Sequence, residues 1–410
     1  MTVETEKRGP EPAPEDGGRR RARGLVAGPT VLTALSILLA LLIGAVLIVV
    51  SNPDVQDKAS YFFSRPQDML LAAWTAVSEA YVALFQGSVI NFGGSSGAQV
   101  VRPITETLVT ATPLIAAGLS VALAFRAGLF NIGAEGQIIA ASIAAGYVGF
   151  AWDLPIVVHL LVGIVAGLAA GAVWGGIAGL LKARTGAHEV ITTIMLNYIA
   201  RFLVVYLLSL QAFQREGRTD PISPLVAPSA ELPLLLGISF RLHLGFVLAL
   251  VAAVFVWWLL GRSTIGFRFR AVGANPNAAR TAGISVERSY TGVMLVAGAL
   301  AGLAGVSQVL GTAGYLTAGV SAGLGFDAIT VALLGRGSPV GTVLAGLLFG
   351  ALRAGGIGMQ ASTGTSVDLV LILQALIVLF IAAPPLVRSV FRIKAAGPSG
   401  MGQLSKGWNG

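Results

Sequence analysis

The chain has 410 residues, of which 55% are hydrophobic and only 11% are charged, and its mean hydropathy is +0.81. A soluble domain carries roughly 25% charged residues. This composition therefore excludes a soluble enzyme, a disordered regulator and a nucleic-acid-binding module, despite the net charge of +8. The apolar runs are too long for the strands of a transmembrane barrel. The sequence predicts an all-α polytopic membrane protein embedded in a lipid bilayer.

The first part of the chain predicts a polar tail followed by a membrane helix. Residues 1–24 are rich in Pro, Glu, Gly and Arg, and we expect them to form a disordered tail. Arg19, Arg20, Arg21 and Arg23 directly precede the apolar stretch 29–50. This stretch is longer than the core of a cleaved signal peptide, and the arginines favour a cytoplasmic N-terminus.

Apolar runs recur along the rest of the chain. After 69–86, which we expect to be an interfacial amphipathic helix, they cover 104–126, 128–150, 156–181, 190–211, 243–261, 290–310, 324–335, 339–358 and 366–387. The basic segments 182–189, 262–288 and 391–410 can share the cytoplasmic side with the N-terminus only if the crossings are even in number. We predict about ten crossings, with 315–335 as a broken one, or eight if two glycine-rich runs are re-entrant. The transmembrane permease domain would span 25–390, with a cytoplasmic loop at 262–288, cytoplasmic tails at 1–24 and 391–410, and both termini inside.

The usual signatures of soluble catalysis are missing. No lysine follows a glycine as a nucleotide-binding P-loop requires, and the chain has no cysteine. His159, His188 and His243 lie far apart, and the two G-x-S-x-G matches at 93–97 and 319–323 have no strand–turn–helix context. We therefore predict no catalytic residue, no metal site and no cofactor bound by this chain.

Glycine recurs at every fourth position along one predicted helix. Gly163, Gly167, Gly171, Gly175 and Gly179 would line a single helix face. Such a face lets a second helix backbone approach closely. We favour helix–helix packing over a conduit wall for this stripe.

Five ionisable residues lie within or beside the apolar runs, where charge is costly and often functional. They are Glu106, Arg126, Glu135, Arg201 and Asp327. For Glu106 and Arg126 a position near the membrane boundary is the preferred interpretation. Arg201 follows Asn197 by one helical turn, so the two share a face.

Two segments interrupt the apolar runs with glycines and polar side chains. The first is Phe130–Gln137, with Asn131, Glu135 and Gln137, and the second is Gly323–Ile329, with Phe326 and Asp327. Irregular backbone at membrane depth is tolerated only where it is buried in protein or lines a cavity. Paired interruptions in the two halves of a chain point to a transport site. The alternative is a structural kink with capped carboxylates.

The loop 262–288 carries Arg262, Arg268, Arg270, Arg280 and Arg288 against a single acid, Glu287. Within it, Asn275 followed by Pro276 predicts a helix start, and Gly283 predicts its end. The arginines are explained by topology, but a capped helix with an alanine-rich face is not. We expect a docking surface for another protein.

Four motifs together carry a resemblance to a known family. They are FNIGAEGQ at 130–137, HEVITTIMLNY at 188–198, GANPNAARTAGI at 273–284 and GFDAITVALLG at 325–335. In this order they resemble the membrane permease subunits of bacterial ABC importers. The nearest group is the nucleoside and simple-sugar permeases, which are related to the branched-chain amino-acid permeases. The resemblance covers residues 100–390.

The resemblance implies an importer complex in the bacterial plasma (inner) membrane. A similar permease pairs with a second permease, which we expect to be an unlike chain, with cytoplasmic ABC ATPase subunits that bind ATP and Mg²⁺, and with an extracytoplasmic substrate-binding lipoprotein. The coupling of ATP hydrolysis would involve Gly273, Asn275, Pro276, Asn277, Ala279 and Gly283. The substrate pathway would involve Asn131, Glu135, Gln137, Asn197, Phe326 and Asp327, with Asn131, Gln137 and Asn197 as transient hydrogen-bond partners of the substrate.

Two other classes of function remain open at this point. An ion-coupled secondary transporter of a small polar solute would use Glu135 and Asp327 as proton or cation sites. A membrane scaffold or receptor without transport activity would have no use for the two broken polar segments. An importer permease is the function that the sequence predicts.

Overall fold

The computed structural model of the protein describes residues 29–391, and the secondary-structure elements within this range are all helices. The predicted tail 1–24 and nearly all of the tail 391–410 lie outside the described residues. The helices are α2 (Pro29–Ser51), α3 (Pro53–Ala59), α4 (Pro66–Ser88), α5 (Gly97–Arg126), α6 (Ala134–Ala151), α7 (Ile156–Thr185), α8 (Glu189–Leu208), α9 (Gly245–Arg262), α10 (Thr264–Ala274), α11 (Pro276–Thr281), α12 (Val286–Val306), the π-helix η1 (Ser307–Ala313), α13 (Leu324–Leu334), α14 (Pro339–Thr363), α15 (Val367–Ala382) and α16 (Pro384–Val390).

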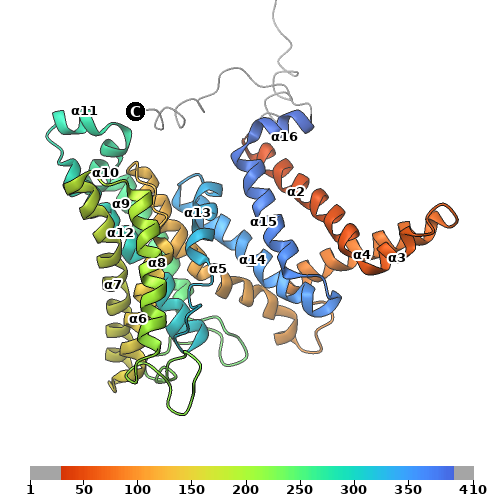
Figure 1. Ribbon diagram of the computed structural model, residues 1–410, viewed down its shortest axis with the longest axis horizontal. Helices are drawn as coiled ribbons and strands as arrows, with labels where there is room; N and C mark the ends of the chain where they lie inside the picture. The colour runs from red at the N-terminus through yellow and green to blue at the C-terminus, as the bar shows by residue number, and fades with distance from the viewer. Residues whose placement is uncertain (1–28, 392–410) are drawn as a thin grey trace, which may run out of the picture.

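The helices confirm a polytopic membrane protein. Between residues 29 and 391, 8 helices are long and apolar enough to cross a membrane, or 9 if α15 and α16, bent by 94°, form one span. This set includes α4, which has the lowest mean hydropathy of the set at 1.3, and omits α6 and the short α13. The interfacial position predicted for 69–86 stays a prediction. The first turn of α2 and the helix α16 lie at the same end of the molecule as α11 (Figure 1).

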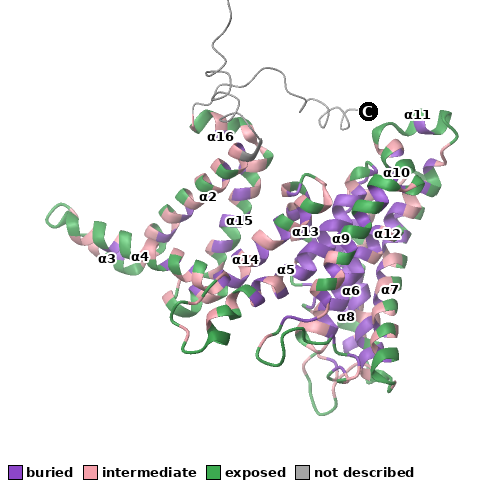
Figure 2. Cartoon of the chain, turned by 180° about the vertical axis from the view of Figure 1, so that it is seen from behind, coloured by how far each residue is buried: buried purple, intermediate pink, exposed green. Residues whose placement is uncertain are grey.

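The core of the main bundle is built by α5 and α12. Both are long and apolar, and the buried share of an 18-residue stretch is 83% in α5 and 78% in α12 with η1, against 22% in α7. Helices α6, α7, α9, α13 and α14 surround them, and the buried residues gather in the middle of the bundle (Figure 2). An apolar residue on every face is what a membrane helix enclosed by other helices requires.

The glycine stripe of α7 packs against α12, as predicted. A Cβ added at Gly171 would lie 2.8 Å from the Cα of Gly302, and one added at Gly175 would lie 3.1 Å from the Cα of Gly298. Contacts this close between two helix backbones require a residue without a side chain at the point of approach, which glycine supplies here on both helices. The stripe is therefore a packing surface and not a conduit wall.

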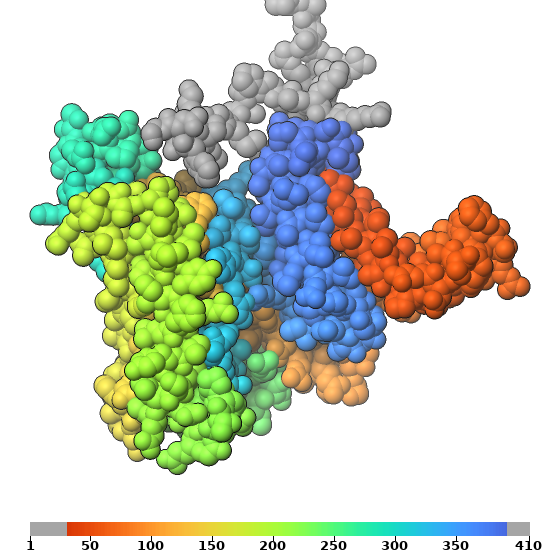
Figure 3. Space-filling model, in the orientation of Figure 1, coloured from red at the N-terminus to blue at the C-terminus, as the bar shows by residue number. Residues whose placement is uncertain are grey.

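A second group of helices stands beside the bundle. Helices α2, α4, α15 and α16 share a separate apolar cluster that includes Ile48, Leu84 and Phe380. The hydroxyl of Tyr81 on α4 donates to the carbonyl of Leu41 on α2 and joins these two helices. Helix α14 connects this second group of helices to the bundle, because it packs on α5 through Gly346 and Gly350 and on α4 through Gly355 (Figures 1 and 3).

Candidate functional site

The two broken segments predicted from the sequence lie against each other. Residues 127–133 form an irregular link between α5 and α6, and the turn before α13 ends at Gly323, whose φ is +75°. The N-terminal turns of α6 and α13 meet so closely that a Cβ at Gly325 would lie 2.8 Å from the carbonyl carbon of Ala134. Glycine at 325 is thus required by the close approach of two backbones.

Glu135 joins these two helix ends directly. Its Oε2 accepts a hydrogen bond of 2.7 Å from the backbone N–H of Gly325. The first N–H groups of a helix have no partner within the helix, and a carboxylate is favoured there by the helix dipole. Glu135 therefore caps α13, which agrees with the structural alternative for this residue, and it also lines the cavity described below.

Asn131 and Gln137 pair with each other inside the protein. Their side-chain amides form two reciprocal hydrogen bonds of 3.1 Å, and Oδ1 of Asn131 also accepts from the N–H of Gly133 at 3.0 Å. Both side chains are buried and neither lines the cavity. In this geometry they hold the irregular link together and lie outside the cavity lining, and their predicted contact with a substrate stays a prediction.

Asn197 fastens the same link to α8. Its Oδ1 accepts from the N–H of Gly136 at 2.9 Å, and its Nδ2 donates to the carbonyl of Ile132 at 3.0 Å. A buried backbone group without a hydrogen bond is costly, so these two bonds stabilise the irregular segment. Asn197 lies in the cavity wall, but both sides of its amide are already engaged.

Asp327 forms an ion pair with a residue that the sequence reasoning missed. Its carboxylate lies 2.7 Å from the guanidinium of Arg353 on α14, and the two side chains are 25% and 23% exposed. Arg353 also donates to the carbonyl of Ala322 at 3.4 Å. The position of Arg353 inside the apolar run 339–358 identifies it as a candidate functional residue, by the same argument that applies to Arg201.

A cavity of about 530 Å³ opens between α8, the start of α6 and the segment from 318 to α13. Its volume lies within the range usual for small-molecule sites. Of the predicted pathway residues it includes Glu135, Asn197 and Phe326, and Phe326 is 51% exposed. The full lining is Ile132, Glu135, Ile139, Ile194, Asn197, Tyr198, Arg201, Ala318, Gly319, Ser321, Ala322, Gly323 and Phe326. Tyr198 and Ser321 are cavity residues that the sequence analysis did not name.

The three remaining ionisable residues have different surroundings. Glu106 is flanked by Arg102 at 3.6 Å and Arg241 at 3.3 Å. Arg126 donates through Nε to the carbonyl of Gly337 at 2.9 Å and so ties the end of α5 to the turn after α13. Arg201 is exposed in the cavity wall.

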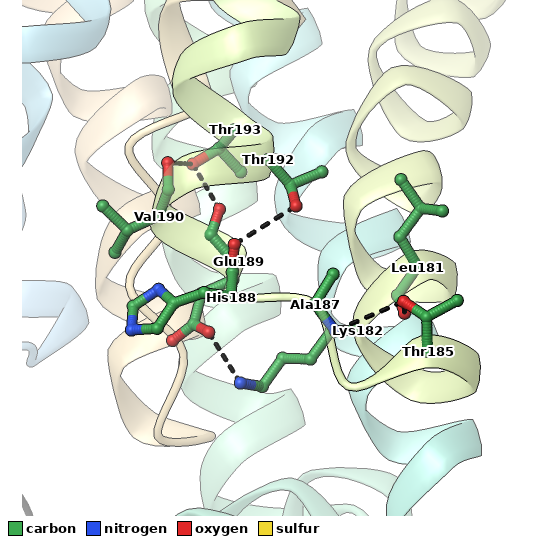
Figure 4. Close-up of polar contacts among 9 residues, drawn as sticks. All are labelled: Leu181, Lys182, Thr185, Ala187, His188, Glu189, Val190, Thr192 and Thr193. Atoms are coloured by element: carbon green, nitrogen blue, oxygen red, sulfur yellow. Dashed lines mark hydrogen bonds and ion pairs between the residues drawn. The ribbon is translucent and has the colours of Figure 1, made fainter.

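The second family motif, at the start of α8, fixes a helical hairpin. Nζ of Lys182 near the end of α7 lies 2.6 Å from Oε2 of Glu189 at the start of α8 (Figure 4). The same ammonium lies 5.4 Å from the ring centre of Tyr290 on α12, a cation–π distance. Glu189 of this motif therefore joins α8 to Lys182 on α7, which in turn contacts α12, and neither charged residue lines the cavity.

The predicted capped helix in the loop 262–288 is confirmed as α11. Oδ1 of Asn275 accepts from the N–H groups of Asn277 and Ala278, both at 3.0 Å, and Pro276 is the first helical residue. The helix stops before Gly283, whose φ is +80°. Ala279 is buried and belongs to an apolar cluster with Val272 and Val286, so it packs inward and is not part of an exposed docking face.

Gly273, at the end of α10, rests on the end of α5. A Cβ at this position would lie 2.8 Å from the backbone carbon of Ala127, and it would also meet the carbonyl of Arg126. Residue 127 begins the irregular link that leads to Asn131 and Glu135. The basic loop and the cavity wall are thus connected through one short stretch of backbone.

These features define a multi-helix transport-type membrane protein, in which the N-terminal turns of α6 and α13 meet beside a cavity. Residues 104–382 match the family described as the branched-chain amino acid transport system / permease component, so the chain belongs to this family. It is 42% identical over 333 residues to the guanosine ABC transporter permease protein NupP of Bacillus subtilis (80% of this chain, 92% of the relative). It is 38% identical over 298 residues to the nucleoside ABC transporter permease protein NupB of Lactococcus lactis (68% and 79%). It is 35% identical over 369 residues to the glucose ABC transporter permease protein TsgB13 of Haloferax volcanii (87% and 87%). No solved structure matches the chain significantly.

Proposed function

We propose that this chain is the permease subunit of an ABC importer that carries nucleosides, and that the cavity between α6, α8 and α13 is its part of the translocation pathway. The observation that carries the proposal is the meeting of the N-terminal turns of α6 and α13 at a cavity of about 530 Å³. Two of the three relatives described above are named for guanosine or nucleosides, and their percent identities to this chain, 42% and 38%, are higher than the 35% of the glucose permease, which matches over a longer stretch than NupB does.

Among the predicted pathway residues, Glu135, Asn197 and Phe326 form the wall of the pathway. Asn131, Gln137 and Asp327 support this wall, because their polar groups are engaged by one another or by Arg353. Glu135 and Asp327 serve as a helix cap and an ion-pair partner. This use of the two carboxylates favours the importer over an ion-coupled secondary transporter.

The energy for transport comes from partner subunits in this proposal. Helix α11 docks on a cytoplasmic ABC ATPase that binds ATP and Mg²⁺, with Asn275, Pro276 and Asn277 exposed at its start. Gly273 passes the movement of the loop to the end of α5. This places both termini and the loop 262–288 in the cytoplasm, and it places an extracytoplasmic binding lipoprotein on the opposite face.

The second permease of the complex is an unlike chain. Bacillus subtilis has a second guanosine ABC transporter permease protein, NupQ, which is 29% identical to this chain over 254 residues, against 42% for NupP. The difference supports a heteromeric pair in which this chain takes the place that NupP would take.

The test is uptake of labelled nucleosides, pentoses and hexoses in cells with the gene deleted and restored. We expect nucleoside uptake to be lost on deletion and to require ATP when the membrane potential is maintained. Uptake that survives ATP depletion and stops with an uncoupler would refute the importer and make Glu135 and Asp327 ion-coupling residues. Normal nucleoside uptake with loss of hexose uptake would correct the substrate to a sugar.

A further inference from the structure

Arg201 lies in the cavity wall, and its charged side chain has no partner among residues 29–391. It lies in the second half of α8 and shares one helix face with Ile194, Asn197 and Tyr198, all of which line the cavity. Among residues 29–391 nothing forms a hydrogen bond, an ion pair or a cation–π contact with its guanidinium. Arg126 and Arg353, by contrast, each have a partner.

A guanidinium at membrane depth is costly unless something accepts its hydrogen bonds. Glu135, the carboxylate of the cavity lining, is held by the N–H of Gly325 and forms no ion pair with Arg201. The protein therefore leaves the five donors of this side chain open toward the cavity. Water or a solute in the cavity can supply the acceptors.

The rest of the lining is suited to a flat heterocycle. Tyr198 on α8 and Phe326 on α13 bring two aromatic rings to the same cavity from two different elements. Ile132, Ile139 and Ile194 add apolar surface. Aromatic side chains recognise unpaired bases by stacking on their faces. Helix α8 and the segment around α13 stand next to each other on one face of the molecule (Figure 3).

We propose that Arg201 recognises the base of a 6-oxopurine nucleoside, such as guanosine or inosine, while Tyr198 and Phe326 contact the ring of the base. The planar guanidinium fork matches two adjacent acceptors, and in guanine these are O6 and N7. Adenine presents an amino donor beside N7, and pyrimidines lack the N7 acceptor. This inference rests on the proposed transport of nucleosides and makes Arg201 a specificity-determining residue of that site.

The experiment measures initial uptake of guanosine, 7-deazaguanosine, adenosine and uridine by cells that express the full transporter. The nucleosides are supplied at saturating concentration, so that capture by the binding protein does not limit the rate. We expect Arg201→Gln to lower guanosine uptake about tenfold and to change adenosine and uridine uptake less than about twofold. 7-Deazaguanosine lacks one of the two acceptors, so its uptake should respond much less to the substitution than guanosine uptake does.

Two further variants make the test specific. Arg201→Lys keeps the charge but loses the fork, and we expect it to lose most of the preference for guanosine over adenosine. Phe202 is the next residue on α8, is exposed and does not line the cavity, so Phe202→Leu should leave all four rates unchanged. The amount of each variant in the membrane and the co-purified ATPase are measured in parallel.

Several outcomes would overturn the inference. An equal loss for all four nucleosides in properly assembled Arg201→Gln would make the arginine a structural residue or a partner of the second permease. Unchanged rates in Arg201→Gln would overturn it as well. If Arg201→Gln fails to assemble, the guanosine preference of Arg201→Lys decides, and an unchanged preference refutes the inference. A wild-type transporter that carries sugars but no nucleoside would refute the proposed function itself, which is a different result.

Discussion

The contact between α7 and α12 allows a sharp test of the packing, through substitution of Gly171 by alanine. A Cβ at this position would lie 2.8 Å from the Cα of Gly302 and would also meet the carbonyl of Gly298. Ordinary contacts between carbon atoms lie at roughly 3.5–4 Å, and backbone atoms cannot rotate away. The helices would have to separate by roughly 1 Å, and overpacking of this kind costs about 1–3 kcal/mol. Alanine itself favours a helix by about 1 kcal/mol over glycine, so the net loss is up to about 2 kcal/mol.

The matched control is Gly261→Ala on α9. Gly261 is exposed, and a Cβ there would have no neighbour within 4 Å. This variant should be as stable as the wild type or more stable, because only the helix propensity changes. The assay is thermal unfolding of purified protein in detergent, followed by circular dichroism. Equal melting temperatures for Gly171→Ala and Gly261→Ala would refute the close backbone packing.

Three other substitutions or conditions have definite expected results. Burial, with a smaller effect of Arg241, lowers the pKa of His243 to about 4. As the pH falls, the unfolded chain therefore takes up a proton at this histidine before the folded protein does, so the free energy of unfolding should be full above pH 6.5 and about 2 kcal/mol lower at pH 5. His243→Gln should flatten the pH dependence of the melting temperature. Glu135→Ala should lower uptake and cost about 1–3 kcal/mol in detergent unfolding, whereas Glu135→Gln keeps an acceptor for the N–H of Gly325 and should behave nearly as wild type; equal damage would mean that the charge is required. Asn275→Ala should cost about 1 kcal/mol of local helix stability and reduce co-purification of the ATPase, which Asn275→Ser should restore.

The local features of the fold could be predicted from the sequence. Asn275 and Pro276 mark the start of α11 because capping depends only on a few neighbouring residues. The stripe through Gly171 predicts a close helix contact because its period is that of one helix face. The two interrupted segments can likewise be predicted, because glycines and polar side chains within apolar runs are a local signal.

The pairing of residues distant in sequence could not be predicted. Their polarity marks Asn131 and Gln137 as candidates, but nothing local indicates that their side chains bond to each other and lie outside the cavity lining. Asp327 and Arg353 are neighbours only because α13 and α14 pack side by side. The sequence predicts that Ala279 belongs to an alanine-rich docking face, but in the fold this residue is buried against Val272 and Val286. Polar residues in a membrane protein therefore predict a polar site, while the fold decides which of them face it.

The arrangement also connects the loop 262–288 to the cavity wall through contacts between backbones. Gly273 touches the backbone at residue 127, where the irregular link begins, and this link carries the cap from Glu135 to Gly325 and the two bonds to Asn197. A displacement of α10 and α11 therefore either opens the contact at Gly273 or moves the link. If the contact holds, the starts of α6 and α13 must move together, since the cap joins them. Both contribute to the cavity wall, so the same displacement changes the space available to a substrate.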